Sequence, residues 1–85
     1  MDAPPTVPPR VSLVTRAGCH LCDDARPVVS AVAREAGTGV LELDVDDDDA
    51  LFERYSDLVP VVLVDGVEVS RWWVEPAALR AALAR

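Results

Sequence analysis

The chain has 85 residues, of which 51% are hydrophobic and 27% are charged, a size and balance that suit one domain with a single core. Its formal net charge is -7, because fifteen Asp and Glu residues outnumber eight arginines and lysine is absent. Such a surface repels phosphate groups, so nucleic acid and anionic membranes are not expected partners. No apolar run approaches the ~20 residues of a transmembrane helix.

The first nine residues include four prolines and predict a disordered leader ahead of one domain over residues 10–85. This leader lacks the basic start and apolar middle of a signal peptide, so we expect a cytoplasmic protein. Lys, Ile, Asn and Gln are absent while Ala, Val, Arg and Asp are abundant, a bias that suits a GC-rich bacterial genome.

Both cysteines lie in the short motif Cys19-His20-Leu21-Cys22. The apolar run Val11–Thr15 before it predicts a buried strand, and Gly18 allows a tight turn into a helix that begins near Cys19. Strand, C-x-x-C and helix in that order is typical of a thioredoxin-like redox motif. Two cysteines are too few for a secreted disulfide scaffold.

The helix after the motif has an apolar stripe that continues past Pro27, so we expect this proline to kink the helix without ending it. Gly37-Thr38-Gly39 should end the helix. Residues 40–45 alternate and predict a strand with Leu41, Leu43 and Val45 on its buried face. Because strand, helix and strand follow at this spacing, the two strands should be parallel.

The second half of the chain predicts a short helix over residues 50–55 and a β-hairpin. The aspartates before this helix are explained by capping and the helix dipole, since they lack the glycine and glutamate of an EF-hand calcium loop. Residues 59–64 predict a strand, Asp65-Gly66 a two-residue turn, and residues 67–71 the returning strand. Pro76 should occupy the first position of a last helix.

The predicted order is therefore β-α-β-α-β-β-α, an α/β domain with a four-stranded mixed sheet and helices on both faces. This order, the C-H-L-C motif at the head of the first helix and the Val59-Pro60 pair together resemble a glutaredoxin-like domain of the thioredoxin fold. The resemblance covers residues 10–85. It implies a cis peptide bond before Pro60, facing the cysteine pair and leaving the backbone of Val59 free to pair with an extended substrate.

Cys19 is the candidate nucleophile, because unpaired N–H groups and the positive end of the helix dipole favour its thiolate. Arg16 and His20 could add positive charge, whereas Asp23 and Asp24 act in the opposite direction. Cys22, one turn on, should face inward and act as the resolving thiol. Structural zinc normally needs four Cys or His ligands, so we expect no metal site.

Substrate contacts are expected from Arg16, His20, Leu21, Val59 and Pro60. Arg16 matches by position a basic residue with which glutaredoxins contact glutathione. The chain departs from glutaredoxins at Leu58, where threonine is usual, and at Ser70–Val74, where they have a Gly-Gly turn and an Asp. Glutathione as the specific reductant is therefore left open.

Trp72 and Trp73 take the place of that small turn. We expect one of them to pack under the last helix and the other to lie on the surface. Because adjacent extended residues face opposite ways, at most one of them should face the thiols. The alternative is that they form an apolar contact surface beside the thiols.

These observations predict an enzyme, a thiol–disulfide oxidoreductase in which Cys19 attacks and Cys22 resolves. Its partners would be a disulfide-containing protein or small-thiol substrate and a thiol reductant, with no resident cofactor and a monomeric chain. Two alternatives stay open: an iron–sulfur cluster module bridged across two chains, and a non-catalytic adaptor that uses Leu21, Trp72 and Trp73 as an apolar patch.

Overall fold

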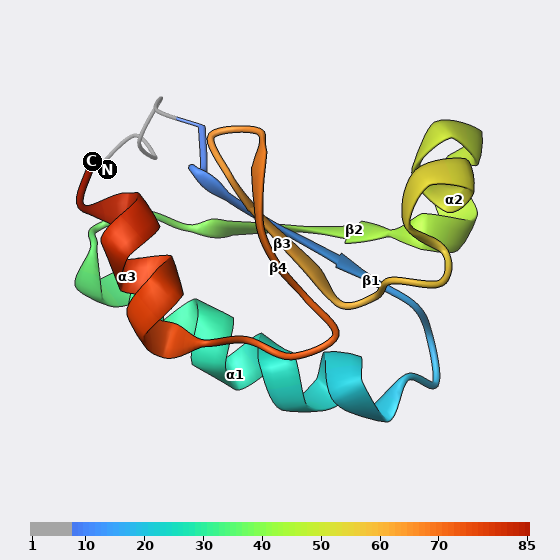
Figure 1. Cartoon of the computed structure of the whole chain (residues 1–85), viewed down its shortest axis with the longest axis horizontal. Coiled ribbons are helices and arrows are strands. Elements are labelled where there is room, and N and C mark those ends of the chain that lie inside the picture. Colours follow the sequence, from blue (N-terminus) through green and yellow to red (C-terminus); the bar gives the residue numbers. More distant parts are fainter. Residues whose placement is uncertain (1–7) are drawn as a thin grey trace, which may run out of the picture.

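The computed structural model describes residues 8–85, so most of the predicted leader lies outside the described residues. The helices and strands follow the predicted order β-α-β-α-β-β-α (Figure 1). Their bounds are β1 (Val11–Thr15), α1 (His20–Glu35), β2 (Val40–Asp44), the 3-10 turn η1 (Val45–Asp47), α2 (Asp49–Tyr55), β3 (Val61–Val64), β4 (Val67–Arg71) and α3 (Pro76–Leu83). Within residues 8–85, no helix has both the length and the apolar character needed to span a bilayer.

The four strands form one mixed sheet in the order β2-β1-β3-β4. β1 and β2 are parallel, as expected for two strands joined by a helix, whereas β3 runs antiparallel to both β1 and β4. The pairing of Val14 with Val61 brings the end of β1 beside the start of β3. The C-x-x-C loop, which follows β1, and the Val59-Pro60 segment, which precedes β3, therefore lie at the same end of the two central strands.

The main core lies between one face of the sheet and the helices α1 and α3, which run side by side beneath it (Figure 1). Val11 and Leu13 of β1 face this layer, and Val29 of α1 and Leu79 of α3 meet them with no more than 1% of their surface exposed. The stripe on α1 is therefore the buried face that its three- and four-residue spacing predicts.

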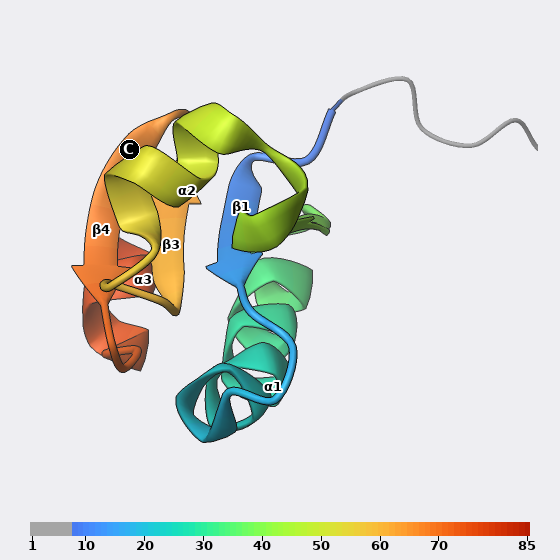
Figure 2. The same ribbon diagram turned by 90° about the vertical axis from the view of Figure 1, so that its right-hand side faces the viewer.

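The short helix α2 covers only one end of the opposite face, so helices do lie on both faces of the sheet (Figure 2). Tyr55 of α2 packs with Val14, Val45 and Val61 in a second, smaller cluster. This cluster lies at the same end as the C-x-x-C loop, and it holds the second half of the chain against the end of β1.

Local capping explains where the elements begin and end. The Asp48 carboxylate accepts a hydrogen bond from the backbone N–H of Leu51 at 3.0 Å, so Asp48 caps α2, as expected for an aspartate before this helix. Gly37 has φ +75° after α1, and Asp65 and Gly66 both have positive φ in the hairpin turn. Pro27 lies inside a continuous α1, as expected.

Three details differ from the sequence prediction. Leu41 is 48% exposed, because β2 is an edge strand and its Leu41 side lies on the face that α1 and α3 do not cover. Val45 is buried but belongs to η1 rather than to β2. β3 begins at Val61, since the chain turns at Pro60, which has no N–H to donate to a ladder.

Candidate active site

The two sulfurs meet at the N-terminus of α1. Cys19 is the N-cap residue, and its Sγ accepts a hydrogen bond from the backbone N–H of Cys22 at 3.2 Å. Cys19 is partly exposed, whereas Cys22 is fully buried, and both are free thiols. The structure therefore leaves the first cysteine partly open to solvent and buries the second, and the inward position of Cys22 is the predicted one.

Burial raises the pKa of the Cys22 thiol to about 11, and its hydrogen bond with the Cys19 side chain acts in the same direction. A backbone hydrogen bond with Arg16 and the positive charge of Arg26 oppose this shift. At neutral pH Cys22 is thus a protonated thiol. It can resolve a mixed disulfide only if its proton leaves during that step.

A cluster of charged side chains joins α1 to the edge of the sheet just after the cysteines. Arg26 donates through Nε and Nη2 to the two Glu42 carboxylate oxygens, both at 2.8 Å, and through Nη1 to Asp23 at 3.0 Å. The buried Thr15 hydroxyl donates to the same Glu42 carboxylate at 2.9 Å. These bonds lower the pKa of Glu42, the Arg26 bonds more than the Thr15 bond. The cluster anchors the first turns of α1, and with them the cysteines, to β1 and β2.

Arg16 points toward α2. Its guanidinium donates to both oxygens of the Asp46 carboxylate at 3.3 Å and to the Ser56 carbonyl at 3.1 Å, and it lies 5.6 Å from the ring centroid of Phe52. In this arrangement Arg16 links the loop before Cys19 to the end of α2. These contacts occupy the side chain that the resemblance assigns to glutathione.

The loop before β3 is held by Trp72. The backbone N–H of Trp72 donates to the carbonyls of Pro60 at 2.8 Å and Leu58 at 3.3 Å, and its indole Nε1 donates to the Asp57 carbonyl at 3.2 Å. The Val59–Pro60 peptide bond is cis, as the resemblance implies, and the Pro60 side chain is fully buried while Val59 is half-buried. Trp72 therefore fixes the backbone of the segment that the resemblance assigns to substrate pairing.

Neither tryptophan packs under α3, so the prediction for this pair was wrong. Trp72 is 41% exposed and Trp73 is 62% exposed. Trp72 has φ +70°, a left-handed conformation that breaks the alternation of an extended chain, and the two rings lie together with centroids 6.2 Å apart. Both residues face a groove that also includes Leu21 of α1.

His20 and Leu21 occupy the first positions of α1 and are exposed, Leu21 to 44%. The structure thus gathers Cys19, His20 and Leu21 at one helix tip, with Cys22 directly behind. Val59 and Pro60 lie at the end of the sheet where β1 finishes, and Arg16 reaches away toward α2.

Comparison with known proteins agrees with this geometry. Residues 10–84 match the sequence profile of the family described as "Glutaredoxin-like domain (DUF836)". The chain belongs to this glutaredoxin-like family. It is 38% identical over 82 residues to an uncharacterized protein of Mycobacterium tuberculosis, an alignment that covers 91% of this chain and 84% of that protein.

Solved structures place the domain in the thioredoxin fold. An X-ray structure of a protein from X. campestris is similar with a TM-score of 0.70 and 36% identity, over 87% of this chain and 95% of that one. A thioredoxin from Halobacterium salinarum is similar with a TM-score of 0.61 and 27% identity, over 86% of this chain and 69% of that one. Together these likenesses support a redox role for the glutaredoxin-like domain.

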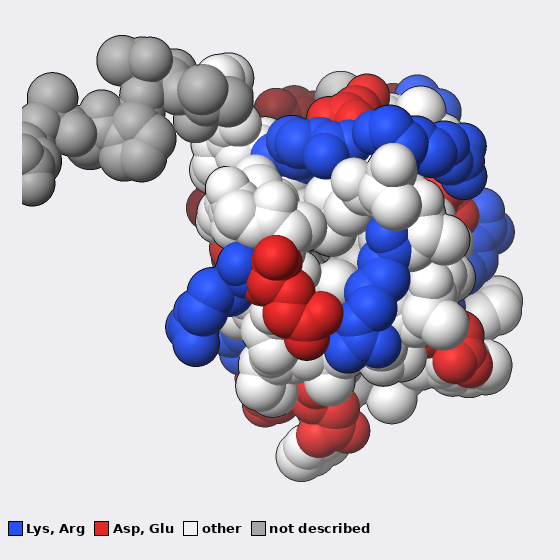
Figure 3. All heavy atoms as spheres, turned by 90° about the vertical axis from the view of Figure 1, so that its left-hand side faces the viewer, with Lys and Arg blue, Asp and Glu red and all other residues white. Residues whose placement is uncertain are grey.

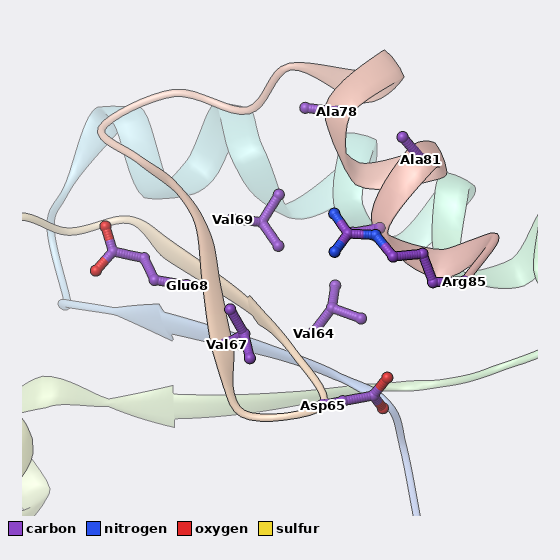
Figure 4. A pocket seen from close by; sticks show the side chains of 9 residues that line it. Val64, Asp65, Val67, Glu68, Val69, Ala78, Ala81 and Arg85 are labelled. Atoms are coloured by element: carbon purple, nitrogen blue, oxygen red, sulfur yellow. The ribbon is translucent and has the colours of Figure 1, made fainter.

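A second depression, of about 450 Å³, lies between the β3–β4 hairpin and α3, at the other end of the domain (Figure 4). Valine and alanine side chains line most of it, and Arg85 extends over it from the end of α3. Its lining within residues 8–85 contains neither cysteine nor histidine. The thiol site is therefore the candidate for chemistry.

Sequence reasoning missed Arg26, Glu42 and the clamping role of Trp72. The pairing of Asp23 with Arg26 at a three-residue spacing was visible on the helix, but their link to Glu42 depends on how α1 packs against β2. The left-handed conformation of Trp72 could not be predicted from the sequence. Glycine is the residue that usually indicates such a position, and a tryptophan there gives no comparable signal.

Proposed function

We propose that the glutaredoxin-like domain is a dithiol–disulfide oxidoreductase of the cytoplasm, where thiols are kept reduced. The Cys19 thiolate attacks one sulfur of a substrate disulfide, forms a mixed disulfide and releases the other sulfur as a thiolate. Cys22 then loses its proton and attacks the Cys19 sulfur, which releases the second substrate thiolate and leaves a Cys19–Cys22 disulfide. Two electrons pass from the dithiol to the substrate. The Cys22 proton is transferred to one released thiolate, and the other takes up a proton from water, which replaces the proton that Cys19 lost when its thiolate formed.

One observation carries this proposal: a partly exposed Cys19 sulfur that accepts a backbone N–H at the tip of α1, directly above a buried second thiol. The N–H dipole and the positive helix end stabilise negative charge on this sulfur, which is the nucleophilic form. The buried Cys22 thiol stays protonated and does not compete for the first attack.

The substrate is either a disulfide in a protein or the disulfide of a small thiol, and a thiol reductant regenerates the Cys19–Cys22 dithiol. We assign no resident cofactor, and the chain acts as a monomer. Glutathione is a weak candidate for the reductant, because Arg16 is held by Asp46 and Ser56 and the bulky Trp72 and Trp73 replace a small turn.

The test follows the Cys19 thiol directly. Reduced protein is mixed with 5,5′-dithiobis(2-nitrobenzoate), and the release of the coloured thiolate is followed with pH in the wild type, Cys19→Ser and Cys22→Ala. We expect fast release in the wild type and in Cys22→Ala, and a loss of at least about 100-fold in Cys19→Ser, since Cys22 is buried and protonated.

The trapped product separates catalysis from simple reactivity. Cys22→Ala should accumulate a stable mixed disulfide, visible by mass spectrometry, whereas the wild type should pass on to the internal disulfide. If Cys19 reacts no faster than a free cysteine at neutral pH, the proposal fails.

A further inference from the structure

A groove of about 210 Å³ begins two residues beyond Cys19. Leu21, Ala25 and Val28 of α1 form one wall, and Trp72, Trp73 and Val74 of the segment between β4 and α3 form the other. Single exposed apolar side chains are common on protein surfaces, but contiguous apolar patches often mark binding sites, and three large side chains, Leu21, Trp72 and Trp73, meet here. Leu21 lies in the first turn of α1, whose N-cap is Cys19, so a substrate bound to Cys19 can extend into the groove.

A single carboxylate interrupts this apolar lining. Asp24 lies on the α1 wall, and the ion pairs found within residues 8–85 do not include it. By contrast, Asp23 beside it is paired with Arg26 at 3.0 Å. Asp24 is therefore an available negative charge at the edge of an apolar groove, on a chain whose net charge is already -7.

The aromatic wall is held in place. Three hydrogen bonds fix Trp72 to the segment from Asp57 to Pro60, and Trp73 rests against the Trp72 ring. A rigid aromatic surface binds an apolar or cationic side chain at a small entropic cost, and the faces of indole rings attract cations most strongly. Trp73, at 62% exposure, offers such a face beside Asp24.

We propose that this groove selects the disulfide substrate: a peptide segment of a partner protein with an apolar and a cationic side chain next to its reactive cysteine. The apolar side chain packs between Leu21 and Trp72, and the cation lies between the Trp73 ring and the Asp24 carboxylate. This inference rests on the disulfide exchange proposed for Cys19. Glutathione fits the groove poorly, since its two carboxylates outnumber its one ammonium group and it has no large apolar side chain.

The experiment uses short peptides whose single cysteine is joined to 5-thio-2-nitrobenzoate (TNB). Cys19 attacks the peptide sulfur, because TNB is the better leaving thiolate, and the colour of released TNB gives the second-order rate constant. Three peptides share one leucine beside the cysteine and differ only in the next residue: Lys, Gln or Glu. Glutathione–TNB serves as the anionic reference.

We expect the Lys peptide to react roughly three- to tenfold faster than the Glu peptide at low ionic strength, with the Gln peptide between them. Asp24→Asn should bring the Lys-to-Glu ratio close to one, and Trp73→Ala should slow the Lys peptide roughly fivefold. Glu53→Gln on α2 is the matched control: it changes the net charge by the same amount, but its carboxylate is not part of the groove lining, so the ratio should stay as in the wild type.

Each result decides one point. A Lys-to-Glu ratio near one in the wild type, a ratio that survives in Asp24→Asn, or a faster reaction with glutathione–TNB would overturn the groove assignment while leaving disulfide exchange intact. If none of the mixed disulfides releases TNB faster with the wild type than with Cys19→Ser, the proposed function fails instead.

Discussion

The two ends of the domain are built in opposite ways. The closed end is the one at which β1 starts, the β3–β4 hairpin turns and α3 ends. There Arg10 donates to both Asp65 carboxylate oxygens, at 3.2 and 2.8 Å, and to the Leu83 carbonyl at 3.0 Å, while its backbone N–H donates to Thr38. One side chain thus ties the start of β1 to the hairpin and to the end of α3. Arginine side chains are prominent across the surface of this end (Figure 3).

The other end, which carries the two cysteines, leaves a thiol and three large apolar side chains exposed. Cys19 is partly exposed, Leu21 and both tryptophans are open to solvent, and Trp72 keeps a left-handed backbone that costs free energy in any residue except glycine. The contrast teaches that this small domain takes its stability from the core and the closed end. The apolar surface at the other end is then free to serve binding.

The largest expected effect comes from the same truncation made at each end. Leu83→Ala should lower the free energy of unfolding by about 2–3 kcal/mol, because Leu83 is 6% exposed and belongs to the core cluster. Leu21→Ala should change it by less than about 0.5 kcal/mol. Urea denaturation of both variants makes the comparison, and equal losses would show that Leu21 is a core residue.

The next effect concerns the buried thiol at high pH. The folded chain holds the Cys22 proton up to about pH 11, whereas the unfolded thiol loses it near 9.0. The associated stabilisation is therefore complete below pH 9 and disappears as the pH rises toward 11, a change on the order of 2 kcal/mol. The free energy of unfolding, measured from pH 8 to pH 11 under reduction, should fall more steeply in the wild type than in Cys22→Ala. If the free energy of unfolding falls equally with pH in the two proteins, the pKa of Cys22 is not raised by folding.

Trp72 offers a way to measure the strain at the end that carries the two cysteines. Trp72→Gly and Trp72→Ala both remove the indole and its bond to Asp57, but only alanine keeps a side chain at φ +70°. We expect the glycine variant to be more stable than the alanine variant by about 1 kcal/mol, although glycine is usually the less stable choice. Thermal unfolding of the two variants measures this difference in stability. A more stable alanine variant would mean that the backbone at residue 72 relaxes away from the left-handed region.

The smallest effect is expected from Glu42. Arg26 and Thr15 lower its pKa in the folded chain, so its contribution is present above the unfolded value of 4.5 and is lost as the pH falls below it. Glu42 is partly exposed, so the effect should be modest. The difference in Tm between the wild type and Glu42→Gln should shrink from pH 7 to pH 3. A constant difference would show that the Arg26–Glu42 ion pair does not stabilise the fold.

Much of the domain was predictable because its signals are local. The apolar run before the C-x-x-C motif, the helical stripe past Pro27, the Asp65-Gly66 turn and Pro76 at a helix start each follow from short-range steric and hydrophobic rules. The errors have non-local causes. Leu41 is exposed because no helix covers its side of the edge strand, and the tryptophans share a groove because hydrogen bonds to the segment from Asp57 to Pro60 hold Trp72 in a left-handed conformation.

The sequence by itself determined the order of the elements, the sulfur pair at a helix tip and the family to which the domain belongs. Only the tertiary structure decided that Arg16 turns toward α2, that Arg26 pairs with Glu42, and that Asp24 and two tryptophans form one groove. The physical reason is distance along the chain. Capping, turns and periodicity act over a few residues, whereas burial and charge pairing at this site join residues that only the folded sheet brings together.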